Sequence, residues 1–134
     1  MLRYKLIIFD WDGTVVNSTA RIIDSMQQAA TAVGMPVLPN LAIQNIIGLG
    51  LPEAIRTLWP SVNESQVAAI APQYAHFFTT ESKVEMELFD GVRLLLKDLL
   101  QRGHVLAVAT GKTRKGLDRM MRELKLGHLF AITR

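Results

Sequence analysis

The sequence predicts an α/β protein with a Rossmann-like parallel sheet, interrupted after its first strand by a block of helices. Near both ends of the chain, short apolar runs alternate with segments of helical periodicity, an order typical of parallel strands joined by crossover helices. Between residues 15 and 85 every periodic segment has helical spacing. We therefore assign 1–14 and 86–134 to a discontinuous core and 15–85 to an inserted helical domain.

The first strand is predicted at 5–9, where the chain is almost continuously apolar before it reaches Asp10. Such a run is typical of a strand that is buried on both faces of a sheet. A helix is then predicted over 18–33, because apolar residues recur at helical spacing and Gly34 follows as a stop.

Three more helices are predicted in the inserted block, separated by proline and glycine residues. The last of them opens with Asn63 and Gln66, which have the spacing of a capping box. These helices cover 41–47, 53–59 and 64–78.

The remainder of the core is predicted to alternate helix and strand, over 91–102, 105–109, 114–126 and 129–133. No helix is predicted after the last strand, and no predicted element covers one flank of the first strand. We expect an incomplete core whose exposed sheet edge offers a route to self-association.

Composition excludes several classes of protein. A chain of 134 residues with 49% hydrophobic residues is expected to fold as a globular protein. No apolar run is long enough to span a bilayer, so no membrane association is expected. The absence of cysteine excludes disulfide scaffolds, thiolate metal sites and cysteine nucleophiles, and it agrees with a cytoplasmic location.

The segment 101–134 is basic, with eight Lys and Arg residues against two acidic ones. Such an excess can attract an acidic ligand or nucleic acid. The solvated face of a helix explains it better, because the segment has no interleaved aromatic residues on which bases would stack. Nucleic-acid binding is therefore disfavoured.

Two aspartates, Asp10 and Asp12, follow the first strand, at the edge where open α/β sheets bind ligands. In extended backbone their side chains point the same way. One carboxylate can act as a nucleophile, while the other donates a proton to the leaving oxygen and later accepts one from water. Because two anions repel an anionic substrate, a cation is needed, and Mg²⁺ commonly bridges carboxylate and phosphate.

Small and polar residues are predicted to complete this site. Gly13 lets the backbone approach a ligand closely. Thr110 and Gly111 follow the next core strand, with a hydroxyl and a flexible amide that suit phosphoryl oxygens. A nucleotide-binding P-loop is disfavoured, because Leu106 stands where that motif needs glycine.

The segment Phe9-Asp10-Trp11-Asp12-Gly13-Thr14 resembles the signature of haloacid dehalogenase superfamily phosphatases, in their phosphoglycolate phosphatase-like branch. Segments 108–112 and 89–92 are similar to that branch's second motif and to its return into the core, and the helical block resembles its four-helix cap. The resemblance implies a Mg²⁺-dependent phosphatase that hydrolyses a small phosphorylated metabolite through an aspartyl-phosphate. Asp12 favours phosphate chemistry over halide displacement, and a phosphoglucomutase activity stays open.

The resemblance also implies roles for individual residues. Asp10 would be the nucleophile, Asp12 the general acid and base, and Thr110 the anchor of the phosphoryl group. Asp10 and the backbone carbonyl of Asp12 would bind Mg²⁺. Further phosphate contacts would come from Gly13, Thr14, Gly111 and Lys112, and the cap loop that meets the substrate would be Gly48, Leu49 and Gly50.

One departure from the family pattern affects the expected activity. The family completes its site with a lysine and an acidic pair that follow the third strand, and this sequence contains neither. Without them the site loses charge stabilisation and metal ligands. We expect the chain alone to be weakly active or inactive. The alternative is a non-catalytic truncated module that binds a partner chain or an acidic ligand.

Overall fold

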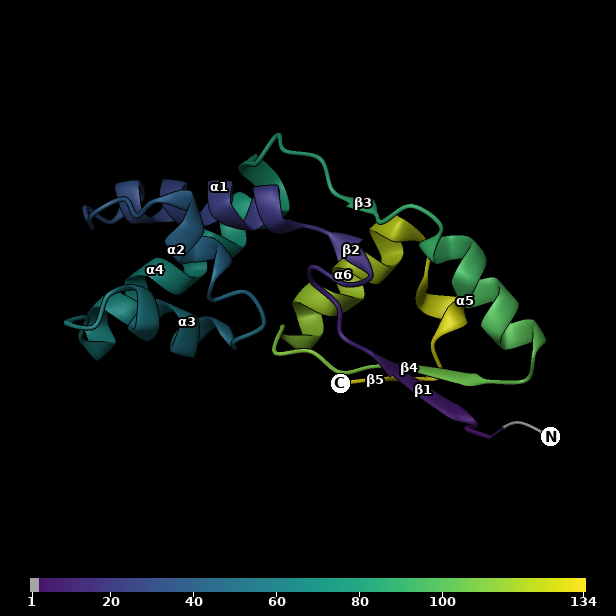
Figure 1. Ribbon diagram of the computed structural model, residues 1–134. Coiled ribbons are helices and arrows are strands. Elements are labelled where there is room, and N and C mark those ends of the chain that lie inside the picture. Colours follow the sequence, from purple (N-terminus) through teal and green to yellow (C-terminus); the bar gives the residue numbers. More distant parts are fainter. Residues whose placement is uncertain (1–2) are drawn as a thin grey trace. The chain divides into compact units, whose positions relative to one another are not determined.

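The structure, a computed structural model, describes residues 3–134 (Figure 1). The chain divides into two compact units. The core unit contains the residues up to Asn17 together with Glu87–Arg134, and the helical unit contains Ser18–Met86. Among the described residues, no helix combines the length and the apolar character that a membrane crossing requires.

The core unit is built on a parallel sheet of three strands in the order β1-β4-β5. The strands are β1 (Leu6–Phe9), β4 (Val105–Val108) and β5 (Ile132–Thr133). Phe9 pairs with Val108, which pairs in turn with Thr133, so the carboxyl ends of all three strands meet at one edge. The predicted α/β class with a parallel sheet is confirmed.

Two helices, α5 (Val92–Gln101) and α6 (Arg114–Leu124), lie on the same side of this sheet (Figure 1). Leu106 and Val108 point to that side and are buried. Three side chains that share the opposite face are exposed: Leu6 by 46%, Ile8 by 60% and Ile132 by 57%. Ala107 in the central strand shares this face and is only 4% exposed, so the face is open at its flanking strands, and we call it the bare face.

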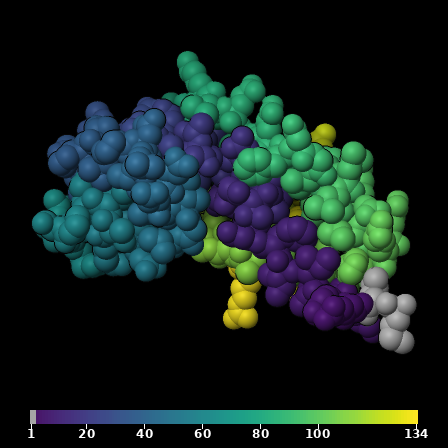
Figure 2. All heavy atoms as spheres, in the orientation of Figure 1, coloured from purple at the N-terminus to yellow at the C-terminus, as the bar shows by residue number. Residues whose placement is uncertain are grey.

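The prediction that the first strand is buried on both faces is therefore wrong. β1 forms an edge of the sheet, and its exposure alternates between exposed and half-buried residues. In Figure 2 the dark purple segment that contains β1 lies uncovered at the surface. An apolar run indicates that its side chains favour burial. It does not show whether a second layer of structure packs against them.

Two short elements of the core unit differ from the predictions. Val16–Asn17 (β2) and Glu87–Leu88 (β3) form an antiparallel pair, although residues 16 and 17 were expected to belong to the helical block. A 3₁₀ turn, η2 (Gly127–Leu129), occupies the beginning of the segment predicted as the last strand, so β5 is only two residues long.

The helical unit contains four α-helices followed by a π-helical turn. Its interior is apolar and includes Met26, Ile43, Ile55 and Ile70, all nearly or fully buried. The elements are α1 (Thr19–Ala32), α2 (Asn40–Gln44), α3 (Leu51–Leu58), α4 (Glu64–His76) and η1 (Phe77–Glu81).

The segment that follows η1, by which the chain leaves this unit, is hydrogen-bonded to α1. Arg21 Nε donates a hydrogen bond of 2.6 Å to the carbonyl oxygen of Val84, and its guanidinium lies 5.7 Å from the ring centroid of Phe78. The Ser82 hydroxyl donates a bond of 2.7 Å to Asp24. These contacts fix the segment that follows η1.

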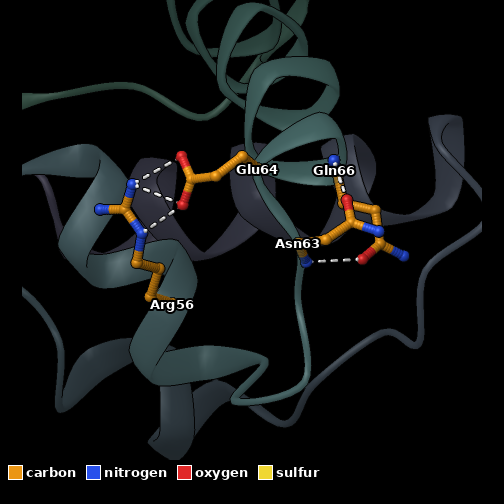
Figure 3. Close-up of polar contacts among 4 residues, drawn as sticks. All are labelled: Arg56, Asn63, Glu64 and Gln66. Atoms are coloured by element: carbon orange, nitrogen blue, oxygen red, sulfur yellow. Dashed lines mark hydrogen bonds and ion pairs between the residues drawn. The ribbon is translucent and has the colours of Figure 1, made fainter.

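The capping box expected at the start of α4 is confirmed (Figure 3). The backbone N–H of Gln66 donates to the Asn63 side chain at 2.8 Å, and the Asn63 N–H donates to the Gln66 side chain at 2.9 Å. Two N–H groups of the helix end thus find partners. In the same region the Nε and Nη2 groups of the Arg56 guanidinium donate hydrogen bonds to the carboxylate of Glu64.

Replacing Asn63 with Ala is expected to lower the free energy of unfolding by about 1 kcal/mol, because the substitution removes a side-chain cap. Arg56→Ala is the matched control. Its ion pair with Glu64 is solvent-exposed, so its loss is expected to cost about 0.5 kcal/mol or less. Urea denaturation measures both. A larger loss for Arg56→Ala would show that the ion pair, rather than the cap, holds this helix end.

Candidate functional site

Both aspartates of the site lie in a tight loop that begins where β1 ends. The carbonyl oxygen of Trp11 accepts three backbone hydrogen bonds, from the N–H groups of Thr14, Val15 and Val16 at 3.1, 2.9 and 3.2 Å. The Gly13 N–H donates to the carbonyl oxygen of Val16 at 2.9 Å. Gly13 has a φ of +78°, which favours glycine because a Cβ is strained there. This positive φ explains the glycine.

Asp10 is exposed at the beginning of this loop. One of its carboxylate oxygens, Oδ1, accepts a hydrogen bond of 2.8 Å from the backbone N–H of Trp11. The bond fixes one oxygen of the carboxylate against the loop, which restricts the side chain to few orientations.

A second loop follows β4, the strand beside β1. The Ala109 N–H donates to the carbonyl oxygen of Phe9 at 2.9 Å, so the sheet pairing continues to the start of both loops. The Thr110 N–H donates to the carbonyl oxygen of Arg134 at 2.7 Å. The Thr110 hydroxyl oxygen accepts a bond of 3.2 Å from the Lys112 N–H, which leaves the hydroxyl hydrogen available for donation.

An ion pair joins the two loops. Lys112 Nζ lies 3.5 Å from Oδ2 of Asp12, and the two side chains are only 12% and 13% exposed. Solvent and salt screen such a pair less than they screen a surface pair. The structure thus places a positive charge beside Asp12, on the loop that also carries Thr110.

The structure brings together most of the site residues that the sequence predicts for the core unit. Asp10 and Asp12 share one loop with the exposed residues Gly13 and Thr14. Thr110, Gly111 and Lys112 form the second loop, and the ion pair connects the two. The pairing of Lys112 with Asp12 was not predicted, and its one signal in the sequence is that each residue closely follows a core strand.

The predicted cap loop lies in the helical unit, between α2 and α3. Gly48 has a φ of +109°, Leu49 is exposed, and Gly50 precedes α3 as its N-cap residue. The segment is thus a turn that ends one helix and starts another, which explains both glycines structurally.

The oxygen atoms of Asp10 and Asp12 suit a magnesium ion whose ligands come partly from the protein and partly from the substrate. Among the residues that the structure describes, no group of three or more His, Cys, Asp or Glu side chains gathers to hold a metal. Asp10 and Asp12 nevertheless offer hard oxygen donors at one loop. Mg²⁺ is usually bound by one or two carboxylates together with waters and substrate phosphates, so two aspartates fit it without a complete protein cage.

The sequence matches the family model of haloacid dehalogenase-like hydrolases over residues 7–133. The chain therefore belongs to this family. It is 32% identical to the tyrosine-protein kinase PtkA of Mycobacterium tuberculosis over 96% of this chain and 43% of that protein. It is also 30% identical to a phosphoglycolate phosphatase of Pasteurella multocida, over 98% of this chain and 62% of the phosphatase.

Solved structures agree with this assignment. The crystal structure of a predicted phosphoglycolate phosphatase from Haemophilus somnus matches with a TM-score of 0.89 and 25% identity, over 99% of this chain and 63% of that one. The structure of PtkA from Mycobacterium tuberculosis matches with a TM-score of 0.81 and 30% identity, over 97% and 59%. The chain thus spans less than two thirds of the length of these relatives.

Proposed function

We propose that this chain carries the nucleophile and the proton-transfer group of a Mg²⁺-dependent phosphatase that acts on a small phosphorylated metabolite. The observation that carries the proposal is the arrangement of two aspartates on one loop, with Lys112 3.5 Å from Asp12. The phosphoglycolate phosphatases among its relatives support a small phosphorylated substrate.

The reaction has two steps. In the first, a carboxylate oxygen of Asp10 attacks phosphorus, the bond from phosphorus to the leaving oxygen breaks, and Asp12 donates a proton to that oxygen. In the second, Asp12 takes a proton from water, whose oxygen attacks the phosphorus of the aspartyl-phosphate. The bond to Asp10 then breaks, which releases inorganic phosphate and restores the carboxylate.

Thr110, Gly111 and Lys112 would bind the phosphoryl group. The Thr110 hydroxyl keeps its hydrogen for donation, since its oxygen accepts from the Lys112 N–H. The ammonium group of Lys112 would offset part of the negative charge that a phosphate brings to Asp12. Gly13 and Thr14 would contribute backbone contacts from the first loop.

Asp10 and the backbone carbonyl of Asp12 would hold Mg²⁺, which when bound supplies further positive charge for the phosphoryl oxygens. The helical unit would serve as the cap, with Gly48, Leu49 and Gly50 facing the substrate. Because the described residues would offer the metal one carboxylate and one backbone carbonyl, and no group of three His, Cys, Asp or Glu side chains gathers among them, we expect weak hydrolysis by this chain alone.

The proposal is tested by incubating the chain with an aryl phosphate, with and without Mg²⁺. We expect slow hydrolysis that requires Mg²⁺ and stops when EDTA removes it. Hydrolysis that persists unchanged in excess EDTA would contradict the assigned role of the metal. An absence of hydrolysis at every Mg²⁺ concentration would contradict the weak activity expected of this chain alone.

A second candidate is phosphoryl transfer to a hydroxyl group other than water, and the identity to a tyrosine-protein kinase favours it. The same assay distinguishes it when it is run with labelled ATP and a tyrosine-containing peptide. Label on the peptide would support transfer to tyrosine, whereas release of labelled inorganic phosphate would support hydrolysis.

A further inference from the structure

We infer that Trp11 is a positioning residue for Asp10 and Asp12, because it ties the loop that carries them to helix α6. The inference rests on the proposed function of the two aspartates.

The peptide groups of Trp11 organise the loop. Its N–H donates to Asp10 Oδ1 at 2.8 Å and so orients the nucleophile. Its carbonyl oxygen accepts the backbone N–H groups of Thr14, Val15 and Val16, which sets the turn on which Asp12 lies. A rotation of the Trp11 peptide planes would therefore move both carboxylates.

The indole of Trp11 fixes those peptide planes to the core. The side chain is completely buried, with an exposure of 0%. Its Nε1 donates to the sulfur of Met120 on α6 at 3.4 Å, over 109 residues of sequence. Its ring also meets Phe130 edge-on, with centroids 6.1 Å apart and an interplanar angle of 74°. Both partners are buried.

One residue thus connects the reacting groups to helix α6 through its backbone and its side chain. Catalysis is sensitive to such a connection, because a displacement of about 1 Å can cost on the order of a hundredfold in rate. A residue that only fills the core would contribute to stability without setting the geometry of Asp10 and Asp12.

Two conservative substitutions separate these roles. Trp11→Phe keeps an aromatic ring and removes the N–H donor, and Met120→Leu keeps the volume and removes the sulfur acceptor. We expect each to lower kcat for aryl phosphate hydrolysis about tenfold and to change KM less than about twofold. Because both remove the same contact, the double variant should be no slower than the slower single variant.

Trp59→Phe is the matched control. Trp59 is the other tryptophan of the chain, is also buried, and donates its indole N–H to the carbonyl oxygen of Pro36 at 3.0 Å, within the helical unit. Trp59→Phe removes the same indole N–H donor at a position outside the loop that carries Asp10 and Asp12, so kcat should stay unchanged. An equal fall of kcat in this control, or fully additive losses in the double variant, would overturn the inference.

Amide hydrogen exchange supplies a readout that needs no turnover. In Trp11→Phe and Met120→Leu the amides of residues 13–16 should exchange about tenfold faster, while those of β4 stay unchanged. Uniformly faster exchange in the loop and β4 would show a packing role only and overturn the inference. If the unaltered chain hydrolyses nothing, the expectation of weak activity fails, and the exchange rates alone decide the role of Trp11.

Discussion

Replacing Asp10 with Asn is expected to reduce aryl phosphate hydrolysis to the background rate, because an amide cannot form the aspartyl-phosphate. The substitution is nearly isosteric. The side-chain oxygen of Asn can still accept the Trp11 N–H that holds Asp10 Oδ1, so the loop should keep its shape. Steady-state hydrolysis measures the loss, and an unchanged thermal denaturation midpoint shows that the fold is intact. Retained turnover would remove Asp10 as the nucleophile.

Asp12→Asn should fail at a different point of the same reaction. It keeps the nucleophile and removes the group that transfers protons, which contributes about 10²–10⁴-fold to the rate. With an aryl phosphate, whose leaving group needs little protonation, the second step should suffer more, so that the aspartyl-phosphate accumulates. Intact-mass measurement should detect the added phosphoryl group in Asp12→Asn and not in Asp10→Asn. Phosphate on Asp10→Asn would place the nucleophile elsewhere.

Replacing Leu106 with Ala is expected to lower the free energy of unfolding by about 2–5 kcal/mol, because it opens a cavity in the core. Leu106 lies in the central strand β4, on the face that α5 and α6 cover, and its exposure is 0%. Such a loss is a large part of the stability of a typical domain, about 5–15 kcal/mol. Denaturation in urea measures it.

Ile8→Ala is the matched control for Leu106→Ala, since it removes the same number of carbon atoms from the neighbouring strand. Ile8 lies on the bare face and is 60% exposed, so we expect it to cost about 1 kcal/mol or less. A loss as large as that of Leu106→Ala would mean that this face is covered in solution. Sedimentation velocity would then show whether a second copy of the chain covers it.

Local sequence signals predicted the helices of both units well. Asn63 and Gln66 marked the start of α4 through a pattern of neighbouring residues, and the structure confirms their mutual hydrogen bonds. The helices of the core unit follow from their apolar periodicity in the same way. These features depend on residues within one or two turns of each other, and a single sequence contains that information.

Features that depend on distant residues were not predictable. The β2–β3 pair joins Val16 to Leu88, and each strand is too short to leave a periodic pattern. The burial expected for β1 depends on layers of structure that no apolar run can specify. At the site, the sequence indicated that the loops after β1 and β4 lie close together. The ion pair of Lys112 with Asp12 could be recognised only in the folded structure.

The antiparallel pairing of β2 with β3 makes the helical unit separable from the sheet. Asn17 and Glu87 are direct partners in this pairing, and the whole of Ser18–Met86 lies between them. Two residues such as Asn-Gly can join the ends of antiparallel strands in a hairpin turn. Ser18–Met86 can therefore be replaced by a short turn or by another helical module between Asn17 and Glu87. The pairing of β2 with β3 in the core unit is retained in either case.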